Sequence, residues 1–121
     1  MIQYAAMSLY RWSDIPKEQL NPACARQVIH TERLTVARLY LAKGALVPEH
    51  QHENEQLTTV ESGKLKMVLA GVEYIVQAGE SLLMAPNVPH WVETLEDTIA
   101  IDTFSPPRED WKRGDDAYLR K

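Results

Sequence analysis

Apolar and polar residues alternate in short runs along most of the chain, and glycine or proline separates many of these runs. Lys64–Leu69 starts with strict alternation, in which Leu65, Met67 and Leu69 face inward and the two lysines face water, as in a strand with one buried face. Ala70-Gly71 then turns the chain into a returning strand over residues 72–76, so we expect a hairpin. Further strands are expected at Gln27–His30, Leu34–Leu41, Ser81–Ala85, His90–Thr94 and Thr98–Phe104. Short strands at this spacing predict an all-β, antiparallel sandwich or barrel.

The two ends of the chain lack this periodicity. Residues 1–24 are expected to form an N-terminal arm, in which Ser13–Leu20 predicts a short helical turn that Asn21-Pro22 ends. Residues 108–121 are charged and are expected to form a tail packed on or near the barrel, which leaves 25–107 as the domain itself. Three large apolar side chains can anchor the tail: Trp111, Tyr118 and Leu119.

Length and composition limit the functions that the chain can have. It has 121 residues, 45% of them hydrophobic and 25% charged, which fits one ordinary globular domain. A net charge of −4 argues against nucleic acid, and no apolar run approaches the ~20 residues of a membrane-spanning helix. Cys24 has no second cysteine to pair with, and Met1–Met7 lacks the positive start of a secretory signal. We therefore expect a cytoplasmic protein that binds neither nucleic acid nor membrane.

Histidine spacing suggests a metal site. His50 and His52 are one residue apart, so on an extended backbone both rings lie on the same face, about 6.6 Å apart along the chain. Gln56 follows four residues later with an amide oxygen, and Pro89 restricts the backbone before His90. Imidazole with amide oxygen suits first-row divalent metals. The simpler alternative is that the paired histidines are polar residues of an exposed loop.

The surrounding residues strengthen the metal interpretation. His50, His52 and Gln56 lie within a block from Gly44 to Gly63, and a second block runs from Gly79 through Pro86 to His90. These blocks resemble the two metal-binding motifs of the cupin superfamily, and the hairpin between them matches as well. The resemblance covers roughly residues 34–104. It implies a single-domain cupin, which is a double-stranded β-helix or jelly-roll barrel, here with a short arm and a tail.

Gln56 is a departure from the pattern, because many cupins have glutamate at this position. A neutral amide leaves the site more positive, which disfavours redox chemistry that needs an anionic ligand and leaves Lewis-acid polarisation intact. Glu53 and Glu55 are nearby and are alternatives to Gln56 as the ligand.

The last expected strand carries an acid among apolar residues. Asp102 shares one strand face with Phe104, and a buried carboxylate needs a partner or a function. Asp102 can act as a general acid or base beside the metal, with Phe104 as an apolar wall that excludes water from the site. The alternatives are a solvent-facing or structurally paired Asp102, and a Phe104 that belongs to the core.

Arg108 follows two prolines, which stiffen the turn and fix where the side chain points. Its planar guanidinium matches a carboxylate, so it can clamp an anionic substrate. A solvent-facing salt bridge to Glu109 or Asp110 is the alternative.

The run Asp102–Asp110 narrows the resemblance to the small single-domain cupins of the KdgF group, which act in pectin and alginate breakdown. That group opens the ring of 4,5-unsaturated monouronates to linear 5-keto-4-deoxyuronate. The resemblance implies the same activity here, as a metal-dependent isomerase with a small anionic sugar as its substrate. It also implies metal ligands at His50, His52, Gln56 and His90, and substrate-handling roles for Asp102, Phe104 and Arg108.

The implied cofactor is a divalent metal ion, and this ligand set accepts Ni, Mn, Fe, Co or Zn. Two other functions fit the same fold and ligands: a cupin dioxygenase, which consumes oxygen, and a non-catalytic sugar-binding or sensor domain. We also expect a homodimer, because this fold often dimerises through sheet edges and the N-terminal arm is available for that contact.

Overall fold

The structure is a computed structural model that describes Tyr4 and residues 7–121. Most of the stretch assessed for a secretory signal lies outside the described residues. No helix in the described part of the chain is long and apolar enough to cross a membrane. The cytoplasmic location and the homodimer therefore stay predictions.

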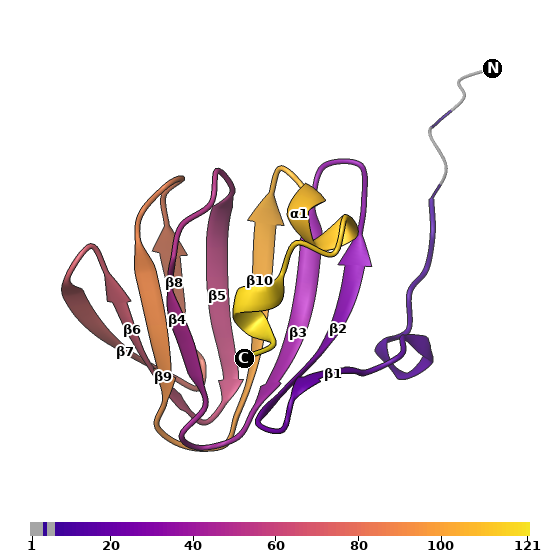
Figure 1. Cartoon of the computed structure of the whole chain (residues 1–121). Coiled ribbons are helices and arrows are strands. Elements are labelled where there is room, and N and C mark those ends of the chain that lie inside the picture. The colour runs from indigo at the N-terminus through magenta and orange to yellow at the C-terminus, as the bar shows by residue number, and fades with distance from the viewer. Residues whose placement is uncertain (1–3, 5–6) are drawn as a thin grey trace.

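Two antiparallel sheets form the body of the protein (Figure 1). The six-stranded sheet has the order β1-β2-β3-β10-β5-β8 and contains β1 (Glu18–Asn21), β2 (Cys24–His30), β3 (Thr35–Leu41), β5 (Glu55–Ser62), β8 (Ser81–Met84) and β10 (Thr98–Ser105). The four-stranded sheet has the order β4-β9-β6-β7 and contains β4 (Leu46–His50), β6 (Lys64–Leu69), β7 (Val72–Gln77) and β9 (His90–Thr94). The all-β barrel expected from the alternation is confirmed.

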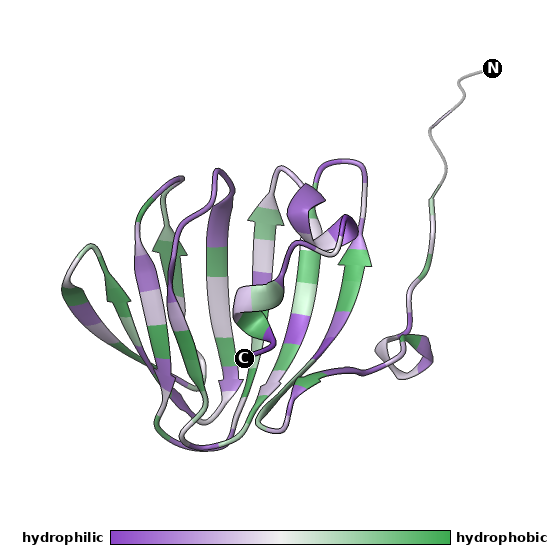
Figure 2. Ribbon diagram, viewed as in Figure 1, coloured by the Kyte–Doolittle hydropathy of each residue, from purple (hydrophilic) through white to green (hydrophobic). Residues whose placement is uncertain are grey.

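The core lies between the sheets and follows the alternation of the strands. Green apolar bands alternate with paler or purple bands along most strands in Figure 2. On β6, Leu65 and Met67 are buried, while Lys64 and Lys66 lie closer to solvent and pair with glutamates. The buried apolar side chains from both sheets include Leu41, Val60, Leu65, Met67, Met84, Val92 and Ala100. The β6–β7 hairpin predicted from the sequence is confirmed.

The N-terminal helical turn is only partly present. A 3-10 turn, η1, covers Trp12–Asp14, but Glu18–Asn21 is strand β1, which pairs with β2. Pro16 interrupts the segment, because its ring disfavours helical backbone at the preceding residue. Leu20 is then buried against the core, so packing favours a strand where local sequence suggested a helix.

Strand β10 sets the geometry of the site because it lies between β3 and β5. Its inward residues are Ala100, Asp102 and Phe104. The face that Asp102 and Phe104 share was predicted from the alternation. The register places Asp102 beside Thr58 and Phe104 beside Gln56 on β5. Polar side chains from two strands therefore meet inside the barrel.

The C-terminal segment crosses in front of β10 and β3 (Figure 1). It contains α1 (Glu109–Lys112) and a 3-10 turn, η2 (Ala117–Leu119). Asp116, which is buried, pairs with the buried Arg26 of β2. Asn21 donates from Nδ2 to the carbonyl oxygen of the last η2 residue over 3.0 Å. The tail is thus fastened to β1 and β2, and all three of its expected apolar anchors pack against the barrel interior.

We expect Gly63→Ala to destabilise the fold strongly. Gly63 has a φ of 93°, and a Cβ there would clash with the Asp97 carbonyl oxygen and the Thr98 hydroxyl. Strain and overpacking together predict a loss of roughly 3 kcal/mol in the free energy of unfolding, measured by urea denaturation. Gly71→Ala is the matched control, because Gly71 also has positive φ but no atom lies near its Cβ position. Its expected loss is about 1 kcal/mol, and equal losses for the two variants would contradict the clash at Gly63.

Candidate metal centre

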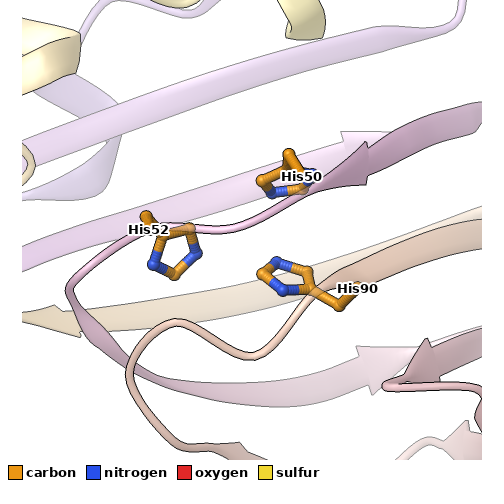
Figure 3. Close-up of side chains that lie close together, drawn as sticks. All are labelled: His50, His52 and His90. Atoms are coloured by element: carbon orange, nitrogen blue, oxygen red, sulfur yellow. The ribbon is translucent and has the colours of Figure 1, made fainter.

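Three histidines converge at one point of the barrel interior (Figure 3). His50 ends β4 and His90 begins β9, and the two residues are paired across the sheet. His52 lies two residues beyond His50 in the loop that leads to β5. One ring nitrogen from each histidine lies within 4.8 Å of the others, so the three are positioned to bind one metal ion. The grouping predicted from the spacing is confirmed.

Hydrogen bonds select one tautomer for all three rings. The Nδ1 atoms of His50, His52 and His90 lie 2.8, 3.1 and 2.8 Å from backbone carbonyl oxygens two residues away in the chain. A carbonyl only accepts, so each Nδ1 carries the proton and each Nε2 keeps a lone pair. Metal-binding histidines are usually oriented by this kind of bond.

The same three rings are held neutral. Burial lowers the pKa of His50 and of His52 to about 4, because desolvation penalises the charged imidazolium. Burial also lowers the pKa of His90, and the positive charge of Arg108 acts in the same direction on all three. Neutral imidazole is the form that binds metal, so the cluster is ready for a cation at neutral pH.

Gln56 completes the cluster on the side of β5. Its Oε1 lies 3.0 Å from Nε2 of His52, so two acceptor atoms face each other. Thr58 fixes this orientation of the amide, because its hydroxyl donates to Asp102 over 2.6 Å and accepts from Nε2 of Gln56 over 3.0 Å. A cation between the two acceptors would satisfy both. The residues present therefore fit a divalent metal bound by three imidazoles and one amide oxygen.

The two glutamates near Gln56 are less suited to be ligands. Glu55 precedes Gln56 on β5 and is exposed, because consecutive strand residues point to opposite faces. Glu53 is also exposed, whereas Gln56 is buried beside His52. The geometry favours Gln56 over both alternatives.

Asp102 lies inside the barrel, with 8% of its surface exposed. Burial raises the pKa of Asp102 to about 6, and the hydrogen bond from Thr58 opposes this shift. The bond to Thr58 uses Oδ1, which leaves Oδ2 available, and Asp102 lines the same cavity as His50 and His90. The solvent-facing alternative for Asp102 is therefore wrong.

Phe104 contacts the histidine cluster as well as the core. Its ring lies 5.7 Å from that of His52, edge to face, and 5.1 Å from that of Trp111. The residue is buried and lines the cavity, so it is both a core residue and an apolar wall of the site. The two interpretations of Phe104 are compatible.

Arg108 is buried, with 2% of its surface exposed, although the sequence left a solvent-facing ion pair open. Its Nε and Nη2 atoms donate to the two carboxylate oxygens of Asp110 over 3.0 and 2.8 Å. The guanidinium carbon lies 4.5 Å from the centre of the Trp111 ring and 4.7 Å from that of Phe104. An ion pair with Asp110 was the alternative for Arg108, and it exists, but it lies at the cavity wall and holds the guanidinium in place.

Three residues of the site were not predicted from the sequence to belong to it: Thr58, Trp111 and Tyr118. Thr58 lies two residues after Gln56 on β5, so alternation places both side chains on the inner face. Thr58 could therefore have been found from the sequence if the strand itself had been predicted. Tyr118 was expected only as an anchor of the tail. Its ring lies 4.5 Å from that of His50, a contact between residues 68 positions apart that no local pattern reports.

One cavity connects most of these groups, although His52 is not among its lining residues. It is lined on one side by His50, His90 and Gln56 and on another by Arg108 and Tyr118 of the C-terminal segment. The volume of this cavity is about 50 Å³, whereas pockets for small molecules usually hold roughly 300 Å³ or more. A sugar must therefore occupy the mouth of the cavity as well, or displace part of the wall.

The chain is similar to known proteins over most of its length. The cupin domain family matches residues 37–103. Pectin degradation protein KdgF of Dickeya dadantii is 32% identical over 101 residues, which are 81% of this chain and 92% of that protein. The solved structure of KdgF from Halomonas sp. has a TM-score of 0.82 at 27% identity and covers 88% of this chain and 99% of its own. An RmlC-like cupin from Shewanella frigidimarina has a TM-score of 0.81 at 28% identity, covering 88% of this chain and 96% of its own. The chain therefore belongs to the cupin family and, within it, to the KdgF-like cupins.

Proposed function

We propose that this protein opens the ring of 4,5-unsaturated monouronates, the sugars released in pectin or alginate breakdown, to give linear 5-keto-4-deoxyuronate. The observation that carries the proposal is a buried carboxylate, Asp102, in the same cavity as His50 and His90, two of the three neutral imidazoles that converge on one point. Membership of the KdgF-like cupins supports the substrate class. The reaction is an isomerisation, so it consumes neither oxygen nor an electron donor.

The reaction moves one proton and breaks one bond. The anomeric hydroxyl loses its proton, the bond from the anomeric carbon to the ring oxygen breaks, and an aldehyde forms. The ring oxygen leaves as an enolate, because it is also the oxygen of the enol ether. Protonation at C4 then gives the ketone, so the proton removed in the first step is replaced in the last.

Asp102 is suited to both proton transfers. A carboxyl whose pKa is about 6 accepts a proton from a polarised hydroxyl and returns it near neutral pH. Thr58 holds Oδ1, so Oδ2 is the atom assigned to the transfer. Phe104 and Trp111 limit the access of water to this side of the cavity.

The remaining groups bind and orient the sugar. A divalent metal held by His50, His52, His90 and Gln56 would supply Lewis-acid polarisation of the substrate's oxygen atoms. Arg108 contributes a fixed positive charge for the carboxylate, and its bonds to Asp110 keep the guanidinium in one orientation. The ligand set suits Ni, Mn, Fe, Co or Zn alike.

Metal binding is expected to require all three histidines. His50→Ala, His52→Ala and His90→Ala should each weaken metal affinity by at least about 100-fold, because one of few ligands is lost. Elemental analysis after dialysis measures the bound metal. His30→Ala is the control, since His30 bonds to Thr35 and does not join the cluster. Full metal content at unchanged affinity in His50→Ala would place the site elsewhere.

The reaction itself is tested with metal-loaded protein and unsaturated galacturonate, by following the loss of enol-ether absorbance in the ultraviolet. We expect turnover without oxygen uptake, and its loss when a chelator removes the metal. Asp102→Asn keeps the shape and removes the base, so kcat should fall about 10²–10⁴-fold with metal content unchanged. Solvent deuterium should enter C4 in the wild-type reaction. An Asp102→Asn variant with most of its activity would exclude Asp102 as the base.

Arg108→Lys should affect both activity and stability. An ammonium cannot reproduce the paired bonds to Asp110, so we expect a loss of about 2–3 kcal/mol in the free energy of unfolding. The value of kcat/KM should fall at least about 10-fold at temperatures where the variant is folded. Thermal denaturation and steady-state kinetics measure the two effects. Normal kinetics with reduced stability would give Arg108 a structural role only.

A further inference from the structure

We propose that the hydroxyl of Tyr118 and Nη1 of Arg108 form the donor pair that receives the carboxylate of the substrate. Tyr118 then contacts the substrate and makes the protein specific for sugars that carry a carboxylate. The inference rests on the proposed function, because the carboxylate of a monouronate is the group that these donors would bind.

The donors of Arg108 are already largely committed within the protein. A guanidinium has five N–H donors, and Nε and Nη2 are directed at the carboxylate of Asp110. Nη2 also donates to the Tyr118 oxygen over 2.7 Å. Among residues 7–121 and Tyr4, no acceptor bonds to Nη1, so its two protons are left for a ligand. Arg108 therefore offers a substrate carboxylate one nitrogen, not the two-nitrogen edge of a free guanidinium.

Tyr118 can supply the missing second donor. Its oxygen accepts from Nη2 of Arg108 and, at 3.4 Å, from Nε1 of Trp111, so both lone pairs have donors. The hydroxyl proton remains, and none of the described residues, Tyr4 and 7–121, provides a hydrogen-bond acceptor for it. Both Tyr118 and Arg108 line the cavity. The charge on Arg108 polarises the hydroxyl and strengthens it as a donor.

The position of Tyr118 is fixed from three sides. Its ring lies 4.5 Å from that of His50, with an angle of 34° between the ring planes. This contact fixes the hydroxyl relative to the histidine cluster. Two residues before it, Asp116 pairs with the buried Arg26, and the carbonyl of Leu119 after it accepts from Asn21. A donor held in this way needs little reordering when the substrate binds.

This arrangement predicts a preference for acids. A carboxylate has an oxygen for each donor and a charge that complements Arg108, whereas a neutral hydroxymethyl group has one oxygen and no charge. Sites that are built to hydrogen-bond one group reject analogues that leave their donors unpaired.

The test compares wild type with Tyr118→Phe, both loaded with metal. Isothermal titration with galacturonate, which lacks the 4,5 double bond and so does not react, measures binding alone. We expect binding about 10–100-fold weaker in the variant, the range for a lost hydrogen bond to a charged group, with metal content unchanged. Turnover of unsaturated galacturonate should show a KM raised by a similar factor and a smaller change in kcat.

Tyr40→Phe is the matched control. The Tyr40 hydroxyl donates to Gln27 over 2.6 Å outside the cavity, so its loss affects stability but not galacturonate binding. Equal galacturonate affinity in wild type and Tyr118→Phe would overturn the inference, and normal wild-type turnover would then leave the proposed function standing. Weaker binding in Tyr118→Phe, with no turnover in wild type, would support the donor pair and overturn ring opening. Absence of both binding and turnover in wild type would overturn both.

Discussion

Each of the three histidines donates its Nδ1 proton to a backbone carbonyl two residues away, and the candidate site depends on these bonds. They fix the tautomer, so three Nε2 lone pairs converge inside the barrel. Burial adds to the effect, because it keeps the rings uncharged and free of competing protons. Three imidazole nitrogens and the amide oxygen of Gln56 form a set of ligands that suits a divalent cation, so the geometry fits a metal site.

A second constraint comes from the register of β10 against β5. It places Asp102 beside Thr58 and Phe104 beside Gln56, so one strand carries both the carboxylate and an apolar wall. Thr58 has a single proton, and donating it to Asp102 leaves its oxygen to accept from Gln56. The carboxylate thereby sets which end of the Gln56 amide faces the histidines. The proposed base and the proposed ligand are coupled through one hydroxyl.

Alternation predicted much of this fold from the sequence alone, because buried residues recur at every second position along parts of β6, β9 and β10. It failed at β1, where Ser13–Leu20 suggested a helix and packing of Leu20 decided otherwise. It also missed β5, whose inward residues Gln56 and Thr58 are polar. The histidine cluster was predictable from spacing and family motifs. The contacts of Tyr118 with His50 and Arg108 were not, because they join distant segments through packing of the tail.

X-ray absorption at the metal edge of the loaded protein tests the central claim most directly, since it counts the ligands of the bound ion. The account predicts one ion with three imidazole nitrogens at about 2.0–2.2 Å and at least one further oxygen. A spectrum with fewer than three imidazoles would contradict the convergence of His50, His52 and His90 on one metal.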